Sequence, residues 1–309
     1  MAASTPARKT QLTMKLDVAS AAEIESAPYT PGEAATISVR TRSDEPLMVR
    51  LSVPEGSGKV EPGELAADWR GAEATFTAAE GANEPIELTV RPAGAPAQTH
   101  WLRPKRVEVA HAPDITLDGD LADWPAAAHI DPRGLETTPG FAPGICLGWT
   151  DEGLYLAVQA PADAPRPADA QRWWASSNVE IFVDTSSVGS EKWDAATSRQ
   201  YYFLPIREQA AWQAVAGQYL RDDAKGSSVY PTDAVRAAIA AGEDVWTIEA
   251  FIPAAALGKA PAAGETWRVL LSANSVEMDE DSFNASWPRR KPKDLGAGSS
   301  VWGQVRFGQ

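Results

Sequence analysis

The chain has 309 residues, of which 44% are hydrophobic and 23% charged, a composition typical of a globular protein long enough for two domains. Its formal net charge of -14 at pH 7 argues against a nucleic-acid partner, because phosphate binding needs clustered Lys and Arg. No apolar run is long enough to span a membrane, and the single cysteine, Cys146, excludes an internal disulfide.

The first hundred residues alternate short apolar runs with glycine and proline turns, which is typical of β structure. Strands are predicted at residues 14–18, 35–40, 47–53, 74–78 and 86–90. Residues 36–40 and 48–53 show the period-two alternation of strands with one buried face. We therefore expect a flexible N-terminus at residues 1–12 and an immunoglobulin-like β-sandwich at residues 13–98, which shows no catalytic pattern and reads as a spacer.

A proline–glycine break at residues 92–96 and a new alternating strand at 107–110 place the join between Gly94 and Val107, so a second domain is expected at residues 107–309. Strands are predicted there at residues 144–149, 153–159, 178–184, 200–206, 212–219, 246–252, 267–275 and 301–307. The alanine-rich residues 233–241 are the best helical window, and residues 253–257 predict one helical turn that begins with proline. The fold class is all-β, with two β-sandwich domains.

Tryptophan is concentrated in the second domain. Ten of the twelve tryptophans follow the join: Trp124, Trp149, Trp173, Trp174, Trp193, Trp212, Trp246, Trp267, Trp287 and Trp302. A sandwich core needs few indoles, because each buries a large area and its N–H must find an acceptor. We therefore expect some of them to be exposed, where a flat indole face suits the apolar C–H surface of a pyranose ring.

Several segments of the second domain, taken in order, resemble family 9 carbohydrate-binding modules. They are ITLDGDLADW at 115–124, GWTDEGLYLAV at 148–158, WASSNVEIFVD at 174–184, VWTIEAFIP at 245–253, SWP at 286–288 and WGQVRF at 302–307. The resemblance implies a jelly-roll-like sandwich of the group that includes DOMON domains. It also implies non-catalytic binding of sugar chain ends or small saccharides, often as an appendage of a polysaccharide-degrading enzyme.

In this family two tryptophans clamp the sugar, and the resemblance places the first at Trp174. The segment after Trp287 lacks an aromatic residue for the second, so Trp173 or Trp287 is expected to substitute, or the site is a one-sided platform. Strand alternation puts Asn178 and Glu180 on one face, where an amide and a carboxylate can pair with sugar hydroxyls. The expected sugar-binding residues are Trp174, Trp173, Trp287, Asn178, Glu180 and Arg172. Glu180 alternatively has a structural role, such as pairing with Arg199.

Acidic residues raise the question of calcium, which takes several oxygen ligands from loops. Family 9 modules can carry structural calcium, and the expected ligands are Asp118, Asp120 and Asp184. The other interpretation is that residues 118–123 form a turn, because Asp-Gly is a turn dipeptide. No other cofactor is expected.

Three other function classes stay open. A spacer or adhesive module would have no sugar site, and a haem-binding DOMON-like domain would need axial ligands from Met278, His111 or His129. A glycosidase would need a carboxylate pair, for which Glu180 and Glu249 are candidates. The expected partners are an oligosaccharide or polysaccharide and other modules of a larger enzyme. The expected location is extracellular or periplasmic, although this chain shows no signal peptide.

Overall fold

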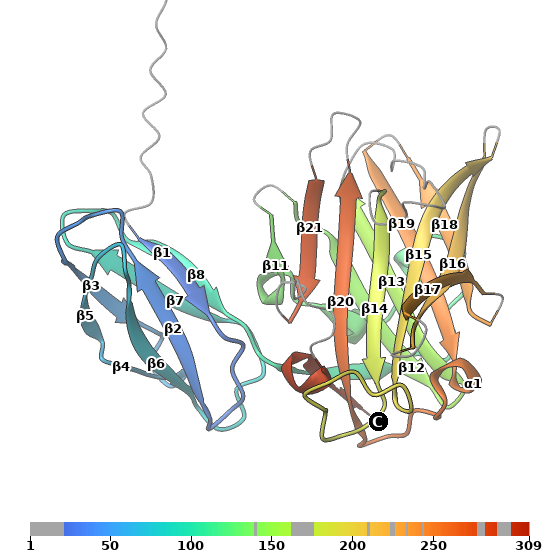
Figure 1. The fold of residues 1–309 in the computed structure, drawn as a ribbon, viewed down its shortest axis with the longest axis horizontal. Helices are drawn as coiled ribbons and strands as arrows, with labels where there is room; N and C mark the ends of the chain where they lie inside the picture. The colour runs from blue at the N-terminus through green and yellow to red at the C-terminus, as the bar shows by residue number, and fades with distance from the viewer. Residues whose placement is uncertain are drawn as a thin grey trace, which may run out of the picture.

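A computed structural model describes residues 22–138, 141–161, 176–208, 211–222, 226–232, 234–242, 244–276, 282–288 and 298–308. These residues form two β-sandwiches that lie side by side (Figure 1). The expected all-β class with two sandwich domains is confirmed. The predicted strand at residues 14–18 and the flexible N-terminus at 1–12 lie outside the described residues. Within the described residues, no helix has the length and apolar character needed to cross a membrane.

The first sandwich consists of two four-stranded sheets. One contains β1 (Glu23–Ser26), β2 (Ala34–Arg40), β6 (Ala72–Ala78) and β4 (Gly58–Glu61), and the other β5 (Glu64–Ala67), β3 (Leu47–Ser52), β7 (Ile86–Pro92) and β8 (Gln98–Leu102). Alternate residues of β2, β6 and β7 are buried between the sheets. Because β8 pairs with β7, this sandwich continues through Leu102, beyond the expected end at residue 98.

The second sandwich is a single sheet that folds back on itself into two layers. One layer contains β17 (Gly226–Pro231), β16 (Ala211–Asp222), β15 (Ser198–Glu208), β14 (Asn178–Asp184), β20 (Thr266–Val276), β21 (Ser282–Trp287) and β11 (Glu136–Thr137). The other contains β10 (His129–Ile130), β12 (Gly144–Thr150), β13 (Gly153–Pro161), β19 (Val245–Pro253) and β18 (Arg236–Ala241). The strands β22 (Gly303–Phe307) and β9 (Arg106–His111) connect the layers at one side, and β16 lies beside β18 at the other.

Most of the described tryptophans are packed rather than exposed, which corrects the expectation from composition. The core between the layers contains Trp149, Trp246, Trp267 and Trp287. Trp124 and Trp302 are buried on the outer faces of the two layers, in separate apolar clusters, and Trp193 and Trp212 are half-buried. A sheet this wide encloses a long core and also has covered outer faces, so it accommodates more indoles than a small sandwich does. Trp173 and Trp174 lie outside the described residues.

The predicted helix at residues 233–241 is wrong, because residues 236–241 form the edge strand β18. Ala237, Ile239 and Ala241 pack against the core, which is the period-two pattern of a strand. Pairing with β19 outweighs the modest helix propensity of alanine in so short a segment. The predicted helical turn is confirmed as α1 (Ala254–Leu257), which follows Pro253 and ends at Gly258 with a φ of 82°.

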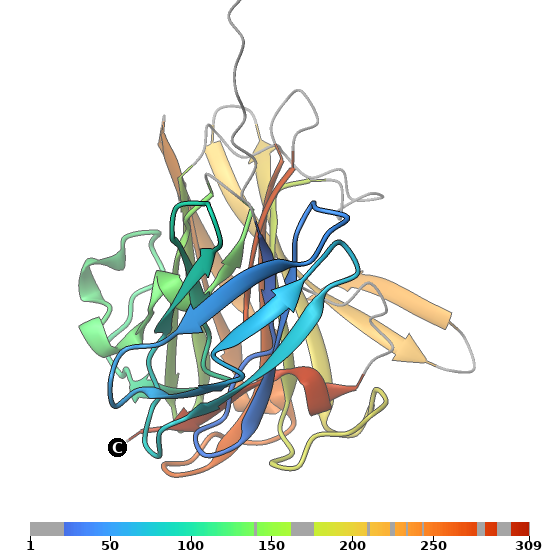
Figure 2. The same cartoon turned by 90° about the vertical axis from the view of Figure 1, so that its left-hand side faces the viewer.

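The connection between the sandwiches is held from both sides. The Tyr29 backbone pairs with the connecting segment, since Tyr29 N–H donates to Arg103 O at 2.8 Å and Lys105 N–H donates to Tyr29 O at 2.7 Å. The Arg103 side chain donates to Leu135 O of the second sandwich at 3.0 Å. Figure 2 looks at the first sandwich with the second behind it. The connecting segment is therefore ordered by contacts with both units.

Candidate functional site

The outer face of β14 is polar where a packed sheet would be apolar. All seven residues of β14 are buried, and alternation directs Val179, Ile181 and Val183 into the core. Asn178 and Glu180 therefore lie on the opposite face, as the sequence predicts, and each is only 1% exposed. Burying amide and carboxylate groups is costly unless they are hydrogen-bonded, so such a row needs an explanation beyond packing.

Three asparagines form a row across neighbouring strands. Asn274 of β20 is the register partner of both Asn178 of β14 and Asn284 of β21. The Asn284 side-chain amide donates to Asn274 Oδ1 at 2.5 Å, and the Asn274 amide donates to Asn178 Oδ1 at 2.8 Å. The Asn178 amide in turn donates to Ser176 O at 2.9 Å. The row ends at residue 176, directly after the segment that contains Trp173 and Trp174 in the sequence.

A second row lies one pleat further along the same strands. The Gln200 amide of β15 donates to Glu180 Oε2 at 2.9 Å, and Ser272 is the register partner of Glu180 on β20. The Asn284 amide also donates to Ser272 Oγ at 3.1 Å, which links the two rows. We call this surface the polar face and define it by six residues: Asn178, Glu180, Gln200, Ser272, Asn274 and Asn284.

The polar face gives way to an apolar cluster toward the other end of β14. Phe182, Leu270 and Trp302 pack together there, with the Phe182 and Trp302 ring centroids 5.8 Å apart. The polar face is therefore confined to the end of the sheet where β14 begins, next in the sequence to residues 162–175.

The structure sorts the expected sugar-binding residues into distinct groups. It brings Asn178 and Glu180 together on the polar face, whereas Arg172, Trp173 and Trp174 lie outside the described residues. Trp287 is fully buried between the layers, because its side chain alternates inward on β21, so the expectation that it stacks on a sugar beside Asn178 and Glu180 is corrected.

The structure does not show the pairing of Glu180 with Arg199 that was the structural interpretation of Glu180. Arg199 donates to the Ala195 and Ser198 carbonyl oxygens at 2.9 Å, and Gln200 rather than Arg199 bonds Glu180.

Sequence reasoning missed the members of the polar face on β15, β20 and β21. Polar residues at i and i+2 were the available signal: Ser272 and Asn274 lie in the strand predicted at residues 267–275, whereas Asn284 and Ser286 lie in a segment for which no strand was predicted. The Ser286 hydroxyl is fully buried and has no hydrogen-bond partner among the described residues. Which strands lie side by side is not readable from this pattern, so the shared face could not be assembled.

The expected calcium ligands do not come together. Asp118 Oδ1 accepts the Asp120 N–H at 2.9 Å and Asp120 Oδ1 accepts the Ala122 N–H at 3.1 Å, so both carboxylates shape a turn. Asp184 lies on β14, where it accepts the Ser299 hydroxyl and the Ser186 N–H. Among the described residues, no group of three or more His, Cys, Asp and Glu side chains is arranged to hold a metal. The described donors therefore do not fit a calcium site.

The buried carboxylate of Glu249 explains the spacing of Asp118, Gly119 and Trp124 in the segment at residues 115–124. Glu249 Oε2 of β19 accepts the N–H groups of Asp118 at 2.9 Å and Gly119 at 2.5 Å, and Oε1 accepts the Trp124 indole N–H at 2.5 Å. Burial raises the pKa of Glu249, and these hydrogen bonds oppose the shift. Gly119 has a φ of +87°, and a Cβ there would lie 2.5 Å from that of Ala240. Glu249 therefore anchors the turn at residues 118–124 to β19.

The two carboxylates considered as a hydrolytic pair lie on opposite outer faces of the sandwich. Glu180 faces away from the core on β14, and Glu249 faces away from it on β19 in the other layer. The core separates them, so they cannot flank one glycosidic bond.

The candidate axial ligands of haem are not grouped either. The His111 ring packs against Trp149 at 4.9 Å, and His129 Nδ1 lies 3.3 Å from Cys146 Sγ. Met278 lies outside the described residues.

Comparison with known proteins yields no family model and no curated protein that matches the chain. Two similar solved structures are a family 9 carbohydrate-binding module from Caldicellulosiruptor kristjanssonii in complex with glucose and in complex with cellotriose. Both are 16% identical to this chain over 66% of its length. The match to the glucose complex has a TM-score of 0.48 and covers 96% of that structure's chain. The match to the cellotriose complex has a TM-score of 0.49 and covers 94% of that structure's chain. At these values the function has to be argued from the residues of the chain itself.

Proposed function

We propose that the second sandwich binds neutral carbohydrate at the polar face and does not transform it. The observation that carries this proposal is the row of hydrogen-bonded amide, hydroxyl and carboxylate side chains across β14, β15, β20 and β21. Such groups offer donors and acceptors at closely spaced positions, which suits the paired hydroxyls of a sugar.

The sequence adds the aromatic component that a sugar site needs. Trp173 and Trp174 precede Ser176, the end of the asparagine row, by only a few residues. An indole beside this row would supply an apolar face for the pyranose ring while the asparagines bond its hydroxyls. The resemblance of the segment at 174–184 to family 9 carbohydrate-binding modules supports the same assignment.

Binding without hydrolysis is supported by the positions of Glu180 and Glu249 on opposite faces. A module of this kind would serve as an accessory unit in polysaccharide recognition or degradation, outside the cell or in the periplasm. In this proposal the first sandwich acts as a spacer.

The test is a titration of the whole chain with neutral oligosaccharides, followed by tryptophan fluorescence and calorimetry. We expect saturable binding that weakens at least tenfold in Asn274→Ala, because the row loses its central link, and that is lost in Trp174→Ala. Trp69→Ala is the matched control, since Trp69 is 55% exposed on the first sandwich and should not affect binding.

Absence of any response from the folded chain, with calcium supplied, would refute the proposal. It would instead favour the spacer function for both sandwiches. Binding that survives both Asn274→Ala and Trp174→Ala would place the sugar elsewhere.

A further inference from the structure

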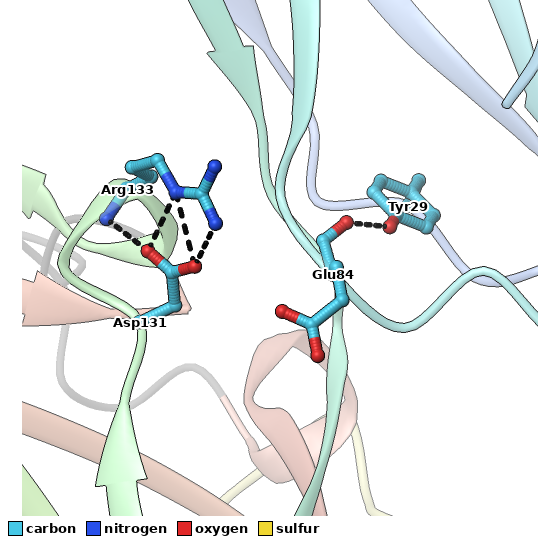
Figure 3. A network of polar contacts seen from close by, with 4 residues as sticks. All are labelled: Tyr29, Glu84, Asp131 and Arg133. Atoms are coloured by element: carbon cyan, nitrogen blue, oxygen red, sulfur yellow. Dashed lines mark hydrogen bonds and ion pairs between the residues drawn. The ribbon is translucent and has the colours of Figure 1, made fainter.

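A cavity of ≈ 650 Å³ lies at the junction of the two sandwiches. The first sandwich contributes residues 83–85 to its lining, and the second contributes β9 and the turn at residues 126–131. Figure 3 shows Glu84 of the first sandwich between Tyr29 and the Asp131–Arg133 pair of the second. The cavity is within the usual size range of small-molecule sites, which often occur between domains.

One wall of this cavity is an unpaired strand edge. β9 pairs with β22 from Arg106 to Val109, whereas β12 pairs with β9 only at Ala110 and His111. Gln304 N–H donates to Lys105 O and Gly308 N–H to Val109 O, so the odd-numbered residues of β9 bond to β22.

The main-chain N–H and C=O groups of Arg106 and Glu108 therefore point away from β22, toward the side where β12 has diverged. No hydrogen bond joins them to another described residue, and both residues line the cavity.

Side chains add further unused hydrogen-bonding capacity. Trp287 lines the cavity, is fully buried, and its indole N–H has no partner among the described residues. Glu84, Glu108 and Arg306 also line it at exposed positions, and none of the three forms an ion pair within the described part of the chain. Water can solvate these three charges, whereas a buried polar group without a partner, such as the Trp287 indole N–H, is normally satisfied by an ordered water or by a ligand.

The balance of these groups selects the ligand class. The carboxylates of Glu84 and Glu108 disfavour an anion, and the guanidinium groups of Arg106 and Arg306 disfavour a cation. Asp131 also lines the cavity, but its carboxylate is paired with Arg133. Val107, Val109 and Leu147 add an apolar component to the lining. We propose that the junction cavity is a second binding site, separate from the polar face, for a neutral polyhydroxylated molecule of monosaccharide to disaccharide size.

The experiment follows the amide and indole N–H signals of the whole chain by ¹H–¹⁵N correlation spectra during titration. The probes are glucose, galactose, mannose, xylose and cellobiose, with glucuronate and glucosamine as charged comparisons. We expect at least one neutral sugar to shift the Trp287 indole and the Glu108 amide in a saturable way. The Asn178 and Asn274 side-chain amides report the polar face in the same spectra, so failure of one site is distinguishable from failure of the other.

Three variants sharpen the test. Glu108→Pro removes a main-chain donor that β22 does not use, and Arg306→Ala removes a rim cation; each should weaken junction binding at least tenfold. Glu73→Gln, an exposed carboxylate change on β6, should leave it unchanged. The proposal is overturned if no neutral sugar shifts the junction signals, if only a charged sugar does, or if Glu108→Pro and Arg306→Ala bind as tightly as the parent chain.

Discussion

Replacing Glu249 with glutamine should destabilise the second sandwich by about 2 kcal/mol, because one carboxylate holds the turn of residues 118–124. The glutamine oxygen can accept either the two main-chain N–H groups or the Trp124 indole N–H, but not all of them. Its amide then faces a donor, which leaves that donor unsatisfied in a buried position.

The magnitude follows from the contacts. A hydrogen bond to a charged group contributes about 1.5–3 kcal/mol, and relief of the buried charge offsets part of the loss in glutamine. Glu249→Ala removes the acceptor for Asp118, Gly119 and Trp124 together and leaves a cavity, so we expect a larger loss of about 3–5 kcal/mol.

Urea unfolding followed by tryptophan fluorescence measures these losses in the transition of the second sandwich. Glu152→Gln is the matched control, since it makes the same charge change at an exposed residue next to β13 and should cost less than about 0.5 kcal/mol. The first sandwich has its own core and serves as an internal reference, because its transition should not move. If Glu249→Gln unfolds at the same urea concentration as Glu152→Gln, the proposed anchoring role of this carboxylate is wrong.

Two further changes test the fold. Gly119→Ala should lower the free energy of unfolding by about 2–4 kcal/mol, since the new Cβ would lie 2.5 Å from that of Ala240 at a φ of +87°. Gly32→Ala is the control: Gly32 has a φ of +75° but no atom within 4 Å of the new Cβ, so the loss should be only about 1 kcal/mol. Equal losses in urea unfolding would contradict the steric explanation. Burial, with a smaller contribution from Arg103, lowers the pKa of His100 from 6.5 to about 4. The unfolded chain then binds a proton that the folded chain does not, so about 2–3 kcal/mol of stability is lost as the pH falls from above 6.5 to about 4. His100→Gln should flatten this pH dependence in calorimetric unfolding, and an unchanged slope would show that another group is responsible.

The structure confirms the elements that depend on local pattern. Period-two alternation predicted the strand at residues 178–184 with its bounds, and it put Asn178 and Glu180 on one face. Proline before alanine-rich sequence predicted the turn that became α1. These features depend on residues close together in the chain, and local sterics and periodicity determine them.

Predictions from local sequence pattern were wrong where strand pairing and packing against distant residues determine the structure. Residues 236–241 have helix-forming alanines, yet pairing with β19 makes them a strand. Tryptophan content indicated exposed indoles, yet Trp246, Trp267 and Trp287 fill the space between two layers whose extent depends on how the sheet folds back. Propensity is a weak preference that tertiary pairing readily outweighs.

The sequence by itself determined the β class, the two sandwiches and the two polar residues on β14. Only the tertiary structure decided that Asn274 and Asn284 join Asn178, that Glu249 holds residues 118–124, and that Glu180 and Glu249 lie on opposite faces. The physical reason is that side-chain direction within a strand follows from the pleat, whereas the neighbours of that strand depend on pairings between residues far apart in the chain.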